Sequence, residues 1–346
     1  MTATATPAPT VALVRRSARV RLLWLAVLVA LLVAAGVTSL AVGSRQVAWH
    51  DVVAALGGAR DGLDHAAVAV RVPRTVLAAL VGAALGLAGA VMQGVTRNPL
   101  ADPGILGVTT GASLAVVVGI AWFGLTTATS KVWVAIVGAG VTAVFVYVIG
   151  SLGRGGATPL KLALAGAATS AALSSFIAGV VLGRNDISGT VRSWQVGGVG
   201  GATFATMTPV LPFLAAGLVV CLACARSLDS LALGDDVAAG LGENVAVARG
   251  VASLGAIVLC GAATSVAGPI AFVGLVVPHA CRLIVGPAHR WLLPFSALAG
   301  ACLLLLGDVV GRVVARPEEI AVGIITAIVG APFFIAIVRR RKVREL

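Results

Sequence analysis

The sequence predicts an all-α protein that crosses a membrane about ten times. Of its 346 residues, 59% are hydrophobic and 11% are charged, whereas soluble domains carry roughly a quarter charged residues. The hydrophobic residues gather in runs of about twenty, the length of a helix that crosses a bilayer. The 43 glycines sit inside apolar runs, where they let neighbouring helices pack closely.

Ten hydrophobic runs are candidate spans, and the eighth, which Pro278 interrupts, is the shortest. They cover residues 20–42, 76–96, 105–125, 132–152, 162–182, 207–225, 249–266, 270–283, 292–311 and 320–338. Together they form one permease-like domain over residues 20–338. Residues 1–19 are expected to be a disordered tail and residues 339–346 a basic tail. The first run has no small-residue cleavage site, so we interpret it as a retained anchor.

The basic residues predict the orientation of the chain. Ten spans place both termini on one side, and sixteen of the 25 lysines and arginines fall on that side. The side richer in basic residues faces the cytoplasm, so both termini are expected there, in a multi-pass protein of the cell membrane. The net charge of +12 does not indicate nucleic acid, because aromatic residues are scarce and the basic residues do not share one soluble face.

The second run begins beside two arginines and carries a row of small residues. Gly82, Gly86, Ala90 and Gly94 recur every four positions, a spacing that favours close contact between membrane helices. If the helix begins near Pro73, Arg71 and Arg74 share one face of its first turn. Cations are disfavoured at a helix N-terminus and are uncommon on the outer side. An external carboxylate or lipid phosphates could compensate them.

Three further groups of residues are candidate sites. Arg312 follows the ninth run, where a helix C-terminus favours a cation. In residues 228–242, Asp235 can cap a two-turn helix that ends at Gly242, and the apolar face would be formed by Val237, Ala238 and Leu241. That helix would fill a groove on a cytoplasmic partner or lie on lipid headgroups. The fifth run carries polar residues that could line a path for a polar solute or bond between helices, namely Thr169, Ser170 and Ser174.

The residues that are missing restrict the mechanism. An ion-coupled carrier would place acidic residues, histidine or lysine inside its spans, and the spans are almost free of them. Asp308, near the end of the ninth run, has no obvious charged partner and is interpreted as interfacial. None of the three lysines follows a glycine, so no phosphate-binding loop of an ATPase is present. Motifs for catalysis, cofactor binding and metal ligation are also missing, and the five cysteines are expected to pack between helices.

Several long segments resemble the FecCD-type permeases, the membrane subunits of ABC importers for iron–siderophore complexes, haem and cobalamin. The matching segments are RVPR (71–74), GAVMQGVTRNPLADPGILGVTTGA (89–112), TPLKLALAGAATS (158–170), LGDDVAAGLG (233–242), GPIAFVGLVVPHACRLIVGPAHR (268–290), GDVVGR (307–312) and EEIAVGIITAIVGAPFF (318–334). They occur in family order and extend from the second run to the tenth.

The resemblance implies a fold like that of the cobalamin-importer permease and a set of partners. These are a second permease subunit, two ATPases inside, a substrate-binding protein outside, the surrounding lipids, and a ferric siderophore or similar chelate as substrate. It implies docking of the binding protein on Arg71, Arg74 and Arg312. The segment implied to contact the ATPase includes Asp235, Asp236, Val237, Ala238, Gly240, Leu241 and Gly242. The fifth run, with Pro159 and the loop before it, is implied to form the path and the gate.

Three alternatives remain at the level of the sequence. The substrate could be cobalamin or haem, because no residue identifies the chelator. The chain could also be an ion-coupled secondary transporter. A membrane-anchored interaction protein without a transport role is the third alternative.

Overall fold

The computed structural model describes residues 17–104, 106–152 and 158–342. Within this part of the chain it contains fifteen helices and no strand. Residues 1–16 and 343–346 of the predicted tails, and residues 153–157 of the loop before the fifth run, lie outside the described residues. The membrane-type helices are α1 (Ala18–Ala41), α3 (Gly62–Thr96), α4 (Val108–Phe123), α5 (Ala128–Ser151), α6 (Pro159–Leu182), α9 (Leu211–Ala223), α10 (Ala225–Leu231), α12 (Val245–Ala267), α13 (Val273–Val285), α14 (His289–Val314) and α15 (Val322–Lys342).

These helices follow the ten predicted runs in order, provided that α9 and α10 are counted as one bent span. Six are long and apolar enough to cross a membrane, and the α9–α10 pair, bent by 47°, would be a seventh. Three shorter apolar helices complete the set, at Val108–Phe123, Val273–Val285 and Val322–Ala336. The all-α, polytopic prediction is therefore confirmed.

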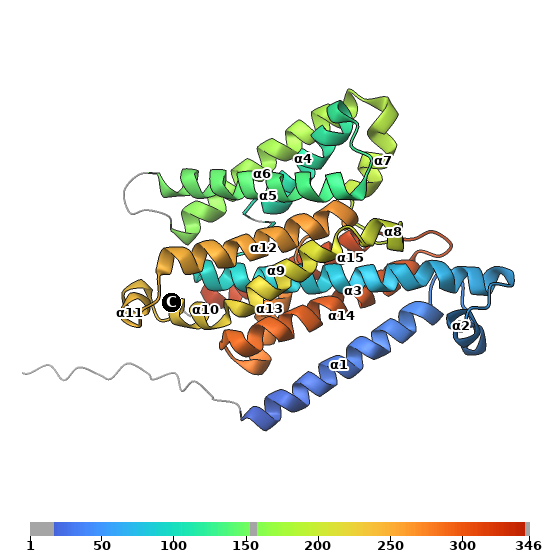
Figure 1. The fold of residues 1–346 in the computed structure, drawn as a ribbon, viewed down its shortest axis with the longest axis horizontal. Helices are drawn as coiled ribbons and strands as arrows, with labels where there is room; N and C mark the ends of the chain where they lie inside the picture. Colours follow the sequence, from blue (N-terminus) through green and yellow to red (C-terminus); the bar gives the residue numbers. More distant parts are fainter. Residues whose placement is uncertain (1–16, 105, 153–157, 343–346) are drawn as a thin grey trace, which may run out of the picture.

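Four short helices lie between the long ones, and they define the two ends of the bundle. These helices are α2 (Trp49–Leu56), α7 (Asn185–Gln195), α8 (Phe204–Met207) and α11 (Asp235–Gly240). Helices α2 and α8 lie at one end, which we term the α2 end, whereas α11 lies at the opposite end, the α11 end (Figure 1). Helix α1 begins and α15 ends toward the α11 end (Figure 1).

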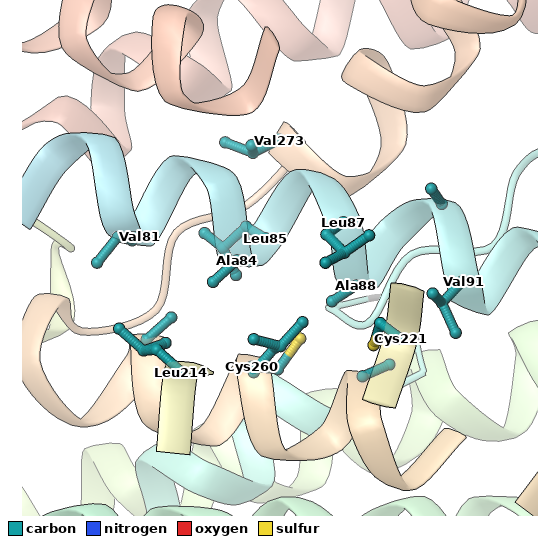
Figure 2. Packing of buried hydrophobic residues seen from close by; sticks show 14 of the residues in the cluster. Val81, Ala84, Leu85, Leu87, Ala88, Val91, Leu214, Cys221, Cys260 and Val273 are labelled. Atoms are coloured by element: carbon teal, nitrogen blue, oxygen red, sulfur yellow. The ribbon is translucent and has the colours of Figure 1, made fainter. Parts of the chain in front are cut away.

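Helix α3 is the centre of the bundle. In its most apolar 18-residue window 72% of the residues are buried, against 6% in α1, which lies at the periphery. Helices α12, α13 and α14 surround α3. Figure 2 shows Leu85, Leu87 and Val91 of α3 among Cys221 of α9 and Cys260 of α12. Helices α4, α5 and α6 form a second group, which joins this centre mainly through α5 and α12 (Figure 1).

Close contact between α3 and α14 depends on glycine. A Cβ atom on Gly82 would lie 2.2 Å from the carbonyl oxygen of Gly300, and one on Gly86 would lie 2.3 Å from that of Ser296. Both distances are far shorter than a van der Waals contact, so any side chain would force the helices apart. The row of small residues predicted from the sequence is thus the surface on which α14 packs.

The start of α3 differs from the prediction. The helix begins at Gly62, fourteen residues before the predicted run, and Pro73 lies inside it. Its 35 residues span about 52 Å at 1.5 Å per residue, whereas the hydrocarbon core is about 30 Å thick. The first turns contain Asp64 and His65, so hydropathy alone could not assign them to the helix. Arg71 and Arg74 consequently lie within α3, and the argument from a helix N-terminus does not apply to them.

Candidate functional site

A buried cluster of charged residues lies where α3 meets α14 near the α2 end. Arg74 Nε donates to both carboxylate oxygens of Asp308 at 3.0 Å, and Arg74 Nη2 donates to Asp308 Oδ1 at 2.8 Å. Arg74 Nη1 donates to Glu319 Oε2 at 2.6 Å. Asp308 also pairs with Arg312, at 3.1 Å between Oδ2 and Nε. We call Arg71, Arg74, Arg312, Asp308 and Glu319 the arginine cluster.

The other two arginines of the cluster hold the C-terminal end of α1. Arg71 donates to the carbonyl oxygens of Leu40, Ala41 and Arg45. Arg312 donates to the carbonyl oxygen of Ser39 at 3.0 Å and to its hydroxyl at 2.8 Å. The last carbonyls of a helix have no partner in the helix and carry its negative dipole end. The two guanidinium groups satisfy both needs and attach α1 to the bundle.

Burial shows that four of the five members of the arginine cluster, all except Glu319, are internal. The exposed fraction is 6% for Arg71, 8% for Arg74 and 1% for both Arg312 and Asp308. The interfacial interpretation of Asp308 is therefore wrong, because this carboxylate is enclosed and pairs with two arginines. The i, i+4 spacing of Asp308 and Arg312 indicates their pairing from the sequence, whereas nothing local indicates the contact with Arg74, 234 residues away.

At the α11 end, an ion pair attaches α11 to the ends of two long helices. Asp235 Oδ1 lies 3.2 Å from Arg97 Nη2, just after α3, and 2.8 Å from Arg249 Nη2 in α12. The N-cap of α11 is Gly234, with φ of +109°, a conformation that glycine adopts without strain. The predicted capping role of Asp235 is thus wrong, because its carboxylate turns to the two arginines instead.

The outer face of α11 presents apolar side chains to solvent. Val237 is 50% exposed and Leu241 64% exposed, whereas Ala238 is completely buried against the bundle. Leu233, just before the helix, is 62% exposed. The helix ends at Gly240, and Gly242 follows with a positive φ of +85°. The predicted apolar face therefore divides into one residue that faces the protein and two that face outward.

The candidate path residues lie on α6, which Pro159 begins. Thr169 and Ser170 are half-buried and Ser174 is exposed. Ser170 Oγ is enclosed without a hydrogen-bond partner among the described residues. No interhelical hydrogen bond from these three side chains is present in the described part of the chain. The hydroxyls of this face therefore do not join α6 to its neighbours within the subunit.

The fold, with its long apolar helices, defines a polytopic all-α membrane protein. The chain belongs to the FecCD transport family, whose model matches residues 31–340.

Individual relatives support this assignment. The ferric enterobactin transport system permease protein FepD of Escherichia coli (strain K12) is 43% identical over 316 residues, which cover 91% of this chain and 94% of FepD. The iron(3+)-hydroxamate import system permease protein FhuB of Bacillus subtilis (strain 168) is 43% identical over 79% of this chain and 71% of FhuB. A solved ABC transporter assigned to the metal-chelate type, in an inward-facing conformation, superposes with a TM-score of 0.78 at 28% identity, covering 92% of this chain and 99% of that one.

Proposed function

We propose that this chain is the membrane-spanning subunit of an ABC importer that moves a ferric siderophore across the cytoplasmic membrane. The observation that carries the proposal is the 43% identity to the enterobactin permease over almost the whole of both chains. The energy comes from ATP hydrolysed on a separate subunit, because none of the three lysines belongs to a phosphate-binding loop. Both termini and α11 face the cytoplasm, where the positive-inside rule places the richer basic side.

The ATPase docks on α11. Supporting this role, Val237 and Leu241 project from a short helix and could enter an apolar groove of the partner. The ion pairs of Asp235 with Arg97 and Arg249 connect that helix to α3 and α12. Force applied to α11 would therefore reach two long helices of the bundle.

The substrate-binding protein docks at the α2 end, around the arginine cluster. Arg74 is the member best placed for a direct contact, because its Nη1 lies beside the partly exposed Glu319. Arg71 and Arg312 act from inside, where they hold α1 and Asp308 in position. Arg71, Arg74 and Arg312, which match the family pattern, therefore have both a docking role and a structural role.

The path for the chelate runs along α6, between this subunit and a second permease subunit of the same or a sister type. The exposed surface of α6 combines small and hydroxyl residues, including Ala167, Ala171, Ser174 and Ser175, with larger apolar side chains such as Leu164 and Phe176. A large chelate that encloses its metal needs a wide path without charged side chains, and these residues carry no charge. We assign the gate to the cytoplasmic end of α6, where Pro159 begins the helix.

Uptake by proteoliposomes tests the proposal. The vesicles contain the complete transporter with ATP inside, and receive binding protein and a ⁵⁵Fe-labelled catecholate or hydroxamate siderophore outside. We expect uptake that requires ATP and is unchanged by a protonophore. Collapse of uptake with the protonophore, or concentration of the chelate by the chain alone, would refute the mechanism in favour of a secondary carrier. Uptake of labelled cobalamin or haem instead would correct the substrate but not the mechanism.

A further inference from the structure

The two carboxylates of the arginine cluster differ in exposure. The Asp308 side chain is 1% exposed and is shared by Arg74 and Arg312. The Glu319 side chain is 36% exposed, and among the described residues its ion pair is with Arg74. We propose that Glu319 occupies, in the undocked subunit, the position on Arg74 that an acidic residue of the binding protein takes on docking. This inference rests on the proposed docking at the α2 end.

The geometry of the Arg74 guanidinium restricts where an incoming carboxylate can bind. Asp308 occupies the edge formed by Nε and Nη2. Glu319 binds the remaining nitrogen, Nη1, on the side that is partly open to solvent. Nη1 and Nη2 each carry one further N–H, so an outside carboxylate that approaches from the open side would bind at Nη1 beside Glu319. Two carboxylates at one nitrogen repel each other, so the incoming group competes with Glu319 for this site.

The backbone that carries Glu319 is held independently of its side chain. The N–H of Ile320 donates to the carbonyl oxygen of Gly311 at 3.0 Å, and the N–H of Gly323 donates to that of Gly197 at 2.9 Å. Glu319 can therefore leave Arg74 by rotation of its own side chain, without movement of α14 or α15. Exchange of one carboxylate for another also leaves the charge of the cluster unchanged. Glu319 thus acts as an internal competitor that weakens docking and protects Arg74 until the partner arrives.

The test compares Glu319→Gln with wild type in the complete transporter in lipid nanodiscs. The probe is the fluorescently labelled binding protein that supports uptake, titrated at fixed ionic strength. We expect Glu319→Gln to bind it about two- to fivefold more tightly, because a partly exposed ion pair contributes at most about 1 kcal/mol. The matched control is Glu318→Gln, which removes the same charge from the exposed neighbouring residue and should leave the affinity unchanged.

A second background separates this inference from the docking proposal. With Arg74→Gln present, the effect of Glu319→Gln on the affinity should vanish, because Arg74 Nη1, for which the two carboxylates compete, is absent. Unchanged or weaker binding of Glu319→Gln, an equal gain in Glu318→Gln, or persistence of the gain with Arg74→Gln would each overturn the competitor role. If Arg74→Gln alone, folded as judged by size-exclusion chromatography, bound the probe like wild type, the docking proposal itself would fail.

Discussion

The arginine cluster predicts an asymmetry between its two buried partners, Asp308 and Arg74. Asp308→Asn removes the carboxylate that accepts three contacts from Arg74 at 2.8–3.0 Å and pairs with Arg312 at 3.1 Å. Arg74 keeps Glu319, but Arg312 keeps only neutral acceptors, namely Ser39 and, at 3.4 Å, the backbone carbonyl oxygen of residue 308. Removing one partner of a buried ion pair costs about 3–5 kcal/mol, because the other charge stays buried without compensation. We expect Asp308→Asn to lower the free energy of unfolding by an amount in this range.

Arg74→Gln should lower the free energy of unfolding by less, about 1–3 kcal/mol. Asp308 then retains Arg312, so no carboxylate is left buried alone, and the loss is that of hydrogen bonds to a charged group. The double variant should be more stable than the sum of the two single losses predicts, because the substituted residues interact directly.

The free energy of unfolding in mixed detergent micelles, followed by tryptophan fluorescence as the denaturing detergent increases, measures these differences. Glu318→Gln serves as a surface control, with an expected change within about 0.5 kcal/mol. The reasoning is refuted if Asp308→Asn matches the control, or if Arg74→Gln is the more damaging substitution. Either result would mean that water or lipid headgroups, rather than Asp308, compensate the arginines.

Three further predictions concern other parts of the molecule. Gly82→Val should abolish folded, monodisperse protein, because the new Cβ would lie 2.2 Å from a carbonyl oxygen of α14. Gly250→Ala, whose Cβ would have no neighbour within 4 Å, should be tolerated. Equal yields of the two variants would contradict the packing of α3 on α14. Asp235→Asn should retain the fold, because an exposed pair contributes at most about 1 kcal/mol, but should release the ATPase several-fold faster during purification. Glu243→Gln, just outside the ATPase-contacting segment, is the control, and equal release from both variants would contradict the role of the ion pair. The five cysteines are all buried, so maleimide should label them only after denaturation, and labelling of the intact protein in membranes would contradict the packing of the helices.

The sequence alone determined the class of the protein and most of its architecture. Each helix that crosses lipid must satisfy its own backbone hydrogen bonds and match the bilayer in length. The resulting signals are local, so all ten runs could be read from hydropathy. The row of Gly82 and Gly86 was predictable for the same reason, because the spacing of small residues along one helix describes its contact face. The arginines that match the family pattern were visible as a motif.

Only the tertiary structure decided the role of those arginines. Arg74 contacts Asp308 and Glu319, which are more than 230 residues away in the sequence. Arg71 and Arg312 bind the end of α1, and no sequence motif connects either arginine with that segment. Which charges become buried together depends on how α1, α3 and α14 pack, and no single segment contains that information. The early start of α3 has the same origin, because contacts with α2 and α1 stabilise turns that are too polar to be recognised as part of a span. Hydropathy specifies where a helix can cross the membrane, whereas packing decides where it begins and which charges it encloses.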